Sequence, residues 1–142
     1  MTTGTGCVFC AMDPQTLIEE SEYALAVYPR DAIKPGHIII AVKQHVTSFE
    51  ALTGAQAADL FALARRIAAR ALPMLGAEKF YTVSIADLVP HFHLHLLPRM
   101  PGDAPIGPCV MGDSGWKAAV GSPVSDQQIN ELTRALRQPP RP

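Results

Sequence analysis

The chain carries little net charge and has no long hydrophobic run. Its formal charge is −1 over 142 residues, so no overall field attracts DNA, RNA or an acidic membrane, and none of these is expected as a partner. No apolar run approaches the roughly 20 residues that a membrane-spanning helix needs. The N-terminus also lacks the basic region followed by an apolar one that a secretory leader has. We therefore expect a cytoplasmic protein.

Cysteine is scarce as well, with three residues in the chain. Cys7 and Cys10 form a C-x-x-C pair, whereas Cys109 stands alone in a region rich in proline and glycine. A small and odd number of cysteines argues against a disulfide framework and for reduced thiols. The C-x-x-C pair suits metal binding or redox chemistry, and its spacing alone leaves both open.

Two segments have the spacing of amphipathic helices. The longer one covers residues 54–72 behind a capping box that starts at Thr53, and it is predicted to end before Pro73. The other covers residues 125–138, and a short helix is expected within the turn-rich start at 7–20. Apolar and β-branched runs predict strands at residues 23–28, 37–43, 80–86 and 91–97.

These elements predict an α+β fold with a mainly antiparallel sheet of about five strands, one long helix and a C-terminal helix. With 48% hydrophobic and 18% charged residues and no internal repeat, residues 1–142 are expected to form one globular domain. Its core is expected over residues 7–103. Residues 104–142 then supply a loop, with Trp116 as an apolar anchor, and the C-terminal helix.

Three histidines alternate with large apolar residues in the stretch His91–Leu96. In a β-strand this alternation sends His91, His93 and His95 to one face and the apolar residues between them into the core. Same-face neighbours along a strand lie roughly 7 Å apart, which is too far for a direct bond but close enough to serve one ligand. Because the run is internal and interleaved with apolar residues, it is unlike a purification tag and predicts a functional site.

The stretch Val89–Arg99, with His-x-His-x-His followed by two apolar residues, resembles the defining motif of the histidine triad (HIT) family. Upstream, Lys34–His45 resembles the family's Pro-Gly-His strand ending in Lys-x-His, and Cys7–Cys10 resembles the opening of its zinc-containing bacterial-type members. The long helix lies between these blocks, as in the family. The resemblance covers roughly residues 7–103 and implies a HIT-like fold.

The resemblance implies a nucleotide hydrolase that acts at the α-phosphate of a purine nucleotide, either a nucleoside phosphoramidate or a dinucleoside polyphosphate. It implies that His93 is the nucleophile of a covalent nucleotidyl-histidine intermediate, and that His95 contacts the phosphate oxygens or the leaving group. Neutral imidazole is a competent nucleophile near pH 7, which suits this chemistry. The residues expected to bind substrate are His37, Ser84, Val27 and Arg30.

A zinc site is implied as well, with Cys7, Cys10, His45 and His91 as its ligands. Four protein ligands of this Cys₂His₂ type leave zinc no open position, so the metal is expected to be structural. A redox pair normally opens a helix after a strand in a thioredoxin-like unit, and this pattern is absent, so zinc is favoured. The resemblance further implies a homodimer, because HIT proteins commonly pair through the central helix and a sheet edge.

Two departures from the family pattern keep other functions open. Residues 85–90 are shorter than the family's Gly-rich loop, and Pro29 stands where an Asp or Asn contacts the ribose, so either Arg30 or Asp31 replaces it or ribose recognition is weak. The second hypothesis is therefore a catalytically weak nucleotide-binding or scaffold module. The third is a zinc-dependent hydrolase that uses the triad as metal ligands, since three histidines leave a fourth position for water.

Overall fold

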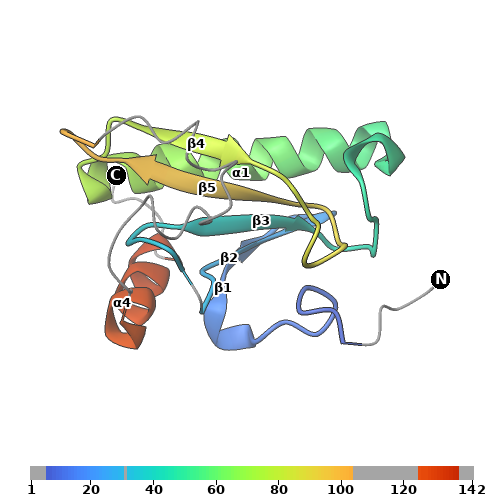
Figure 1. Cartoon of the computed structure of the whole chain (residues 1–142), viewed down its shortest axis with the longest axis horizontal. Helices are drawn as coiled ribbons and strands as arrows, with labels where there is room; N and C mark the ends of the chain where they lie inside the picture. The colour runs from blue at the N-terminus through green and yellow to red at the C-terminus, as the bar shows by residue number, and fades with distance from the viewer. Residues whose placement is uncertain (1–5, 31, 104–124, 138–142) are drawn as a thin grey trace.

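The computed structural model describes residues 6–30, 32–103 and 125–137 (Figure 1). Most of the loop expected before the C-terminal helix, with Cys109 and Trp116, lies outside these residues. None of the helices in the described ranges is both long and apolar enough to cross a membrane.

Five strands form one sheet in the order β1-β2-β3-β5-β4, and every neighbouring pair is antiparallel. This confirms the predicted α+β fold. The first strand lies in the segment where only turns and a short helix were expected, because its pairing with the second strand supplies order that four residues do not encode alone. The strands are β1 (Leu17–Glu20), β2 (Ala24–Val27), β3 (Ile38–Val42), β4 (Lys79–Val83) and β5 (His93–Arg99).

The long helix α1 (Gly54–Leu75) begins at the predicted capping box, in which Thr53 and Gln56 satisfy each other's backbone N–H groups. Its predicted end before Pro73 is wrong, since the helix continues through Pro73 to Leu75. A proline in the last turn removes a single hydrogen bond, with little helix left to disrupt. The helix ends at Gly76, whose φ of 67° is the left-handed conformation typical of a glycine cap.

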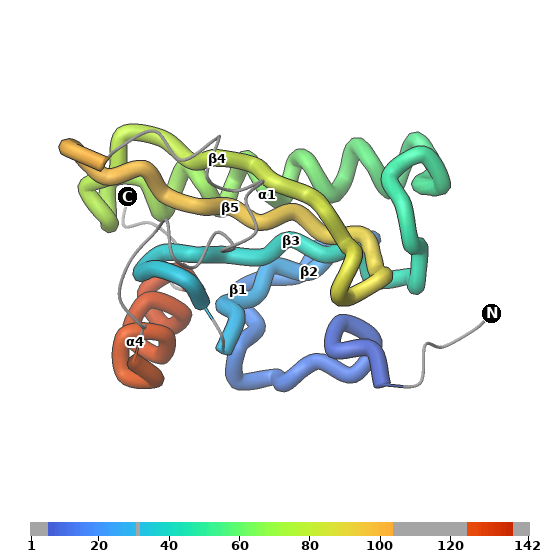
Figure 2. The backbone as a smooth tube through the Cα atoms, viewed as in Figure 1, coloured from blue at the N-terminus to red at the C-terminus, as the bar shows by residue number. Residues whose placement is uncertain are grey.

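The sheet has two different faces. Ile38 and Ile40 of β3 pack with Leu94 and with the buried stripe of α1, and this face holds the main core. Ala41, on the other face, lies directly opposite His93 of β5. The histidine side chains therefore lie on the side away from α1, as their alternation predicts. Figure 2 shows the N-terminal segment, in blue, on that side of the sheet.

The turn before β3 depends on Gly36. Its φ is +88°, and a Cβ there would lie 2.6 Å from Leu75 Cδ1 and 2.9 Å from Pro98 Cγ. Only glycine meets both conditions, because other residues pay for the left-handed backbone and would collide with these side chains. This close approach packs the turn against the end of α1 and places His37 directly before β3.

The C-terminal helix α4 (Asp126–Arg137) confirms the second predicted helix. Ile129 and Leu136 are buried in the same core as α1. The Arg137 guanidinium donates to the carbonyl oxygens of Leu17, Pro14 and Gln15, which joins α4 to β1 and to the short 3-10 helix η1 (Pro14–Thr16). Figure 1 shows α4, in red, beside these elements.

Candidate active site and metal centre

A row of hydrogen-bonded histidines crosses the sheet face that looks away from α1. The Ile33 N–H donates to His37 Nδ1 over 3.2 Å, so His37 carries its proton on Nε2 and donates it to His95 Nδ1 over 2.9 Å. His95 is then protonated on Nε2, which lies 3.1 Å from His93 Nε2. At the other end, His93 Nδ1 donates to the His91 carbonyl oxygen over 2.6 Å. The hydrogen-bond network thus assigns one neutral tautomer to each ring.

These tautomers leave His93 with a lone pair on Nε2, because its proton is on Nδ1. The expectation that same-face histidines lie too far apart to bond directly is wrong for His93 and His95, whose ring centroids are 4.8 Å apart. Their side chains lean toward each other, so the rings are closer together than the spacing of the backbone alone would place them. The network therefore presents one basic nitrogen and one N–H donor side by side.

Burial keeps these rings neutral. It lowers the pKa of His93, against the opposing effect of the His91 carbonyl, and lowers the pKa of His95 to about 4, with the neighbouring His93 acting in the same direction. Both imidazoles are therefore uncharged at pH 7, the state in which His93 Nε2 is nucleophilic.

Acid is expected to destabilise the fold in part through His95. The pKa of this group is about 4 in the folded protein and 6.5 without the fold, so between these values the unfolded chain binds the additional proton. Stability is thus unaffected by His95 above pH 6.5 and falls as the pH drops from 6.5 toward 4. His95→Gln, which does not titrate, should show a smaller fall in Tm between pH 7 and pH 4.5 than the wild type. An equal fall in Tm for the wild type and for His95→Gln between pH 7 and pH 4.5 would contradict the low pKa of His95.

Four side chains meet at the end of the sheet near the N-terminal segment. Cys7, Cys10, His45 and His91 bring one ligand atom each within 4.8 Å of the others. The His91 Nδ1 atom lies 3.3 Å from Cys7 Sγ, 3.7 Å from Cys10 Sγ and 3.2 Å from His45 Nδ1. A tetrahedral zinc site separates its ligand atoms by about 3.4–3.8 Å. The predicted ligands therefore converge with the spacing and the donor types that Zn²⁺ prefers.

The orientation of His91 separates this cluster from the histidine row. His91 is fully buried, and its Nε2 donates to the Val42 carbonyl oxygen, so the Nδ1 lone pair faces the cysteines. The three histidines of the triad consequently do not share one metal position. This arrangement disfavours the hypothesis in which the triad itself holds a catalytic metal.

A cavity of about 640 Å³ opens beside the histidine row. Its walls come from residues 8–16, from residues 27–30 and from the β4–β5 connection at residues 85–89. Figure 2 shows this connection, in yellow, bending toward the N-terminal segment. The predicted residues that line it are His93, His95, His37, Val27 and Arg30.

Two predicted substrate residues are engaged elsewhere. Ser84 is not among the lining residues, and its hydroxyl donates to the His93 carbonyl oxygen over 2.8 Å, where it steadies the backbone of His93. Arg30 reaches the cavity, but its guanidinium forms an ion pair with Asp13 at 2.9 Å. This hydrogen bond lowers the pKa of the Asp13 carboxyl. Asp31, the other candidate near the ribose position, lies outside the described residues.

The sequence did not indicate the role of Phe9 in this site. Its ring lines the cavity and lies 4.7 Å from the ring of His93, between centroids. The signal in the sequence was a large apolar residue between two predicted cysteine ligands. Binding of both cysteines restricts where the side chain between them can lie. That signal is weak without knowledge of which sheet face the cysteines approach.

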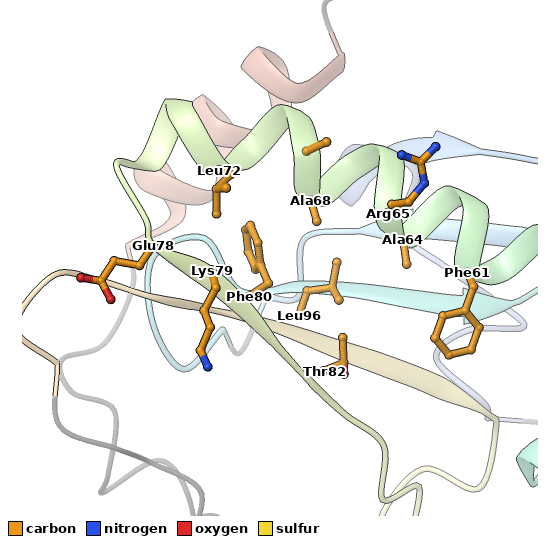
Figure 3. Close-up of a pocket in the computed structure, with 11 residues that line it drawn as sticks. Phe61, Ala64, Arg65, Ala68, Leu72, Glu78, Lys79, Phe80, Thr82 and Leu96 are labelled. Atoms are coloured by element: carbon orange, nitrogen blue, oxygen red, sulfur yellow. The ribbon is translucent and has the colours of Figure 1, made fainter.

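A second cavity, of about 430 Å³, lies between α1 and β4 and contains none of these histidines (Figure 3). Phe61 of α1 lines this cavity and is 55% exposed. Figure 3 shows Leu72, Phe80 and Leu96 along the same groove. This surface combines the central helix with the edge strand of the sheet.

The model of the HIT domain matches residues 11–102 of the chain. The chain belongs to the HIT family. This HIT protein is similar in structure to a Zn-bound histidine triad family protein from Mycobacterium smegmatis, with a TM-score of 0.70, 26% identity, and coverage of 94% of this chain and 91% of the other.

Two curated relatives of this HIT protein carry names that describe enzymes or fusions. One, from Arabidopsis thaliana, is a bifunctional bis(5'-adenosyl)-triphosphatase/adenylylsulfatase, 26% identical over 98 residues that span 65% of this chain and 54% of the relative. The other, from Caenorhabditis elegans, is a nitrilase and fragile histidine triad fusion protein, 34% identical over 82 residues that span 50% of this chain and 17% of the relative. The match thus covers about half or less of each relative's length.

Proposed function

We propose that this HIT protein hydrolyses a purine nucleotide at its α-phosphate through a covalent nucleotidyl intermediate on His93. The observation that carries this proposal is the tautomer of His93. Its Nδ1–H donates to the His91 carbonyl, which leaves the Nε2 lone pair at the wall of the 640 Å³ cavity. His95 supports the proposal by offering an N–H donor 3.1 Å away.

In the first step, the His93 Nε2 lone pair forms a bond to the α-phosphorus, and the bond from phosphorus to the leaving group breaks with its electron pair. The leaving group takes its proton from solvent. Positive charge develops on the His93 ring, and the His91 carbonyl oxygen that accepts from Nδ1–H stabilises it. The His95 Nε2–H then turns from His93 to a phosphoryl oxygen, because the lone pair that it faced has been used.

In the second step, water attacks the same phosphorus and the N–P bond breaks, which returns the electron pair to His93 Nε2. The products are a nucleoside monophosphate and a proton released to solvent. Splitting one displacement into two is the advantage of covalent catalysis, and a phosphorus bound to a cationic imidazole is readily attacked.

The cavity suits a substrate with an apolar base next to a phosphate. Phe9, Met12, Val27 and Ile39 supply apolar walls for a purine, and the histidine row adjoins them. A nucleoside phosphoramidate and a dinucleoside polyphosphate both present an α-phosphate there. The Arabidopsis relative, named for bis(5'-adenosyl) triphosphate, supports including the second class in any substrate panel.

The proposal is tested by intact-protein mass spectrometry after mixing with an adenosine phosphoramidate or a diadenosine polyphosphate. The quench is at high pH, because a phosphohistidine-type bond is labile in acid. We expect an adenylyl adduct on the wild type and none on His93→Ala. No adduct and no turnover across the panel would overturn the proposal.

We further propose that the cluster of Cys7, Cys10, His45 and His91 holds a structural zinc ion. The residues fit this group, since two thiols and two imidazoles lie at tetrahedral spacing and burial lowers the pKa of His91, which favours its neutral, ligating form. The Zn-bound neighbour from Mycobacterium smegmatis supports the choice of metal. With four protein ligands, zinc would supply stability and leave the chemistry to His93.

A homodimer formed through the groove between α1 and β4 is also part of the proposal. Phe61 is 55% exposed there, and β4 is one of the two edge strands of the described sheet. An exposed apolar groove beside an unpaired strand edge favours association. Sedimentation at micromolar concentration should give twice the 15.3 kDa of the chain, and Phe61→Glu should return it to 15.3 kDa. A wild-type mass of 15.3 kDa would contradict the dimer.

One observation favours a second candidate, the catalytically weak nucleotide-binding module. Arg30 is the one cation among the cavity-lining residues that the structure describes, and Asp13 already neutralises it. Transition-state charge on the phosphate would then depend on the histidines alone. Tight binding of adenosine monophosphate without turnover of any substrate in the panel would favour this module over the hydrolase.

A further inference from the structure

We propose that Phe9 is a positioning residue that couples the Cys/His cluster to the orientation of His93. The inference rests on the proposed function, because it concerns the residue that acts there as the nucleophile. It goes beyond that function in assigning a mechanical link between the metal centre and the reacting nitrogen.

The link begins in the tight turn at residues 7–10. The N–H groups of Cys10 and Ala11 both donate to the Cys7 carbonyl oxygen, so these two backbone hydrogen bonds close the turn on itself and do not join it to the sheet. Side chains hold the turn against the sheet. Cys7 Sγ lies 3.3 Å from His91 Nδ1, and Cys10 Sγ lies 3.4 Å from His45 Nδ1. A metal at this cluster would bind both ends of the turn and fix the residues between them.

Phe9 is the residue of this turn that enters the protein. It is 8% exposed and packs with Leu25, Val27, Ile39 and Ala41 on the sheet face away from α1. Because its backbone lies between the two cysteines, its side chain has little freedom once both thiols are bound. The position of this ring therefore depends directly on the cluster.

The ring of Phe9 in turn restricts His93. The two ring centroids are 4.7 Å apart with an angle of 45° between the planes, and the ring of His91 is 5.4 Å away. The hydrogen bond from His93 Nδ1 to the His91 carbonyl holds one edge of the imidazole but still permits tilting about that bond. Phe9 lies in contact with the imidazole and opposes this tilt. The direction of the Nε2 lone pair thus depends on both contacts.

The expected consequence is a change in rate, because a nucleophile displaced by about 1 Å can lose about a hundredfold in rate. Loss of the flat ring should slow bond formation between His93 and phosphorus. A residue that merely lines the cavity would change KM and leave kcat alone. This difference separates positioning from substrate contact.

Phe9→Leu is the test variant, and Phe92→Leu is its matched control. Phe92 is 5% exposed and lies next to the same histidines in sequence, but its side chain is in the core that packs on α1. The control therefore makes the same Phe→Leu change on the other face of the sheet. With metal content unchanged, Phe9→Leu should slow adenylyl-adduct formation and kcat at least about tenfold, and Phe9→Tyr should recover most of the rate. Phe92→Leu should lower Tm but stay within about twofold of the wild-type rate. An equal slowing in both leucine variants, or a rise in KM alone for Phe9→Leu, would overturn the proposal.

A second readout does not depend on activity. Chelating the metal should shift the NMR signals of the His93 ring protons in the wild type, and the shift should be smaller in Phe9→Leu, where only the path through the His91 carbonyl stays. An equal shift in both proteins would overturn the coupling through Phe9. Unmoved signals in the wild type would overturn the coupling. If the wild type forms no adduct with any substrate, the proposed function fails, and the NMR comparison still decides whether the cluster controls the ring of His93.

Discussion

His93→Ala is expected to lower kcat by about 10⁴-fold or more, the loss typical of removing a covalent nucleophile, which corresponds to roughly 5.5 kcal/mol of transition-state stabilisation. The reason is that no neighbouring nitrogen can take its place. His95 Nδ1 accepts from His37, and its Nε2 carries the proton, so it offers no lone pair to phosphorus. Steady-state turnover of an adenosine phosphoramidate and a diadenosine polyphosphate measures the loss.

The fold and the cavity should survive this substitution. His93 packs on one side of the cavity, and the main core between the sheet and α1 does not include it. The Kd of adenosine monophosphate should therefore stay within about threefold of the wild-type value, as measured by calorimetry. His95→Gln is the comparison variant, since it keeps a hydrogen-bond donor near the phosphate and should lose less activity. A His93→Ala protein that turns substrate over at the wild-type rate would show that another group attacks.

Cys10→Ser is expected to release the metal and to lower Tm by about 10 °C or more. Structural zinc contributes apparent folding free energies of about 10–16 kcal/mol in small zinc-dependent peptides. Here the sheet and both helices have their own core, so the loss should be a few kcal/mol, and about 3 kcal/mol corresponds to this change in Tm for a domain of this size. Metal analysis and thermal melts of the purified proteins measure both effects.

Cys109→Ser provides the matched control, because it removes the third cysteine of the sequence, which is not one of the proposed ligands. It should retain one metal ion per chain and the wild-type Tm. Chelation of the wild type should reproduce the fall in Tm and leave reduced but measurable turnover in the molecules that stay folded. Immediate and complete loss of activity, reversed by zinc without any change in Tm, would instead indicate a catalytic metal.

The sequence by itself determined which sheet face the three histidines take, and it predicted the residues of the candidate site. The alternation around His93 and His95 follows from the two-residue period of a strand, and it holds because one face must be buried on α1. The convergence of Cys7 and Cys10 with His91 was likewise predicted from motifs in a fixed order. Chain boundaries of the domain, the cytoplasmic location and the dimer stay predictions.

The tertiary structure decided what depends on contacts between distant segments. The end of α1 beyond Pro73 depends on the cap at Gly76, and the direct contact of His93 with His95 depends on how their side chains lean in a crowded site. The tautomer order begins at the N–H of Ile33, and the packing of Phe9 on His93 joins residues 84 positions apart. Periodicity reports which face a side chain takes, because it reflects local backbone geometry. Which atom of that side chain meets which partner is set by packing, and so only the folded chain determines it.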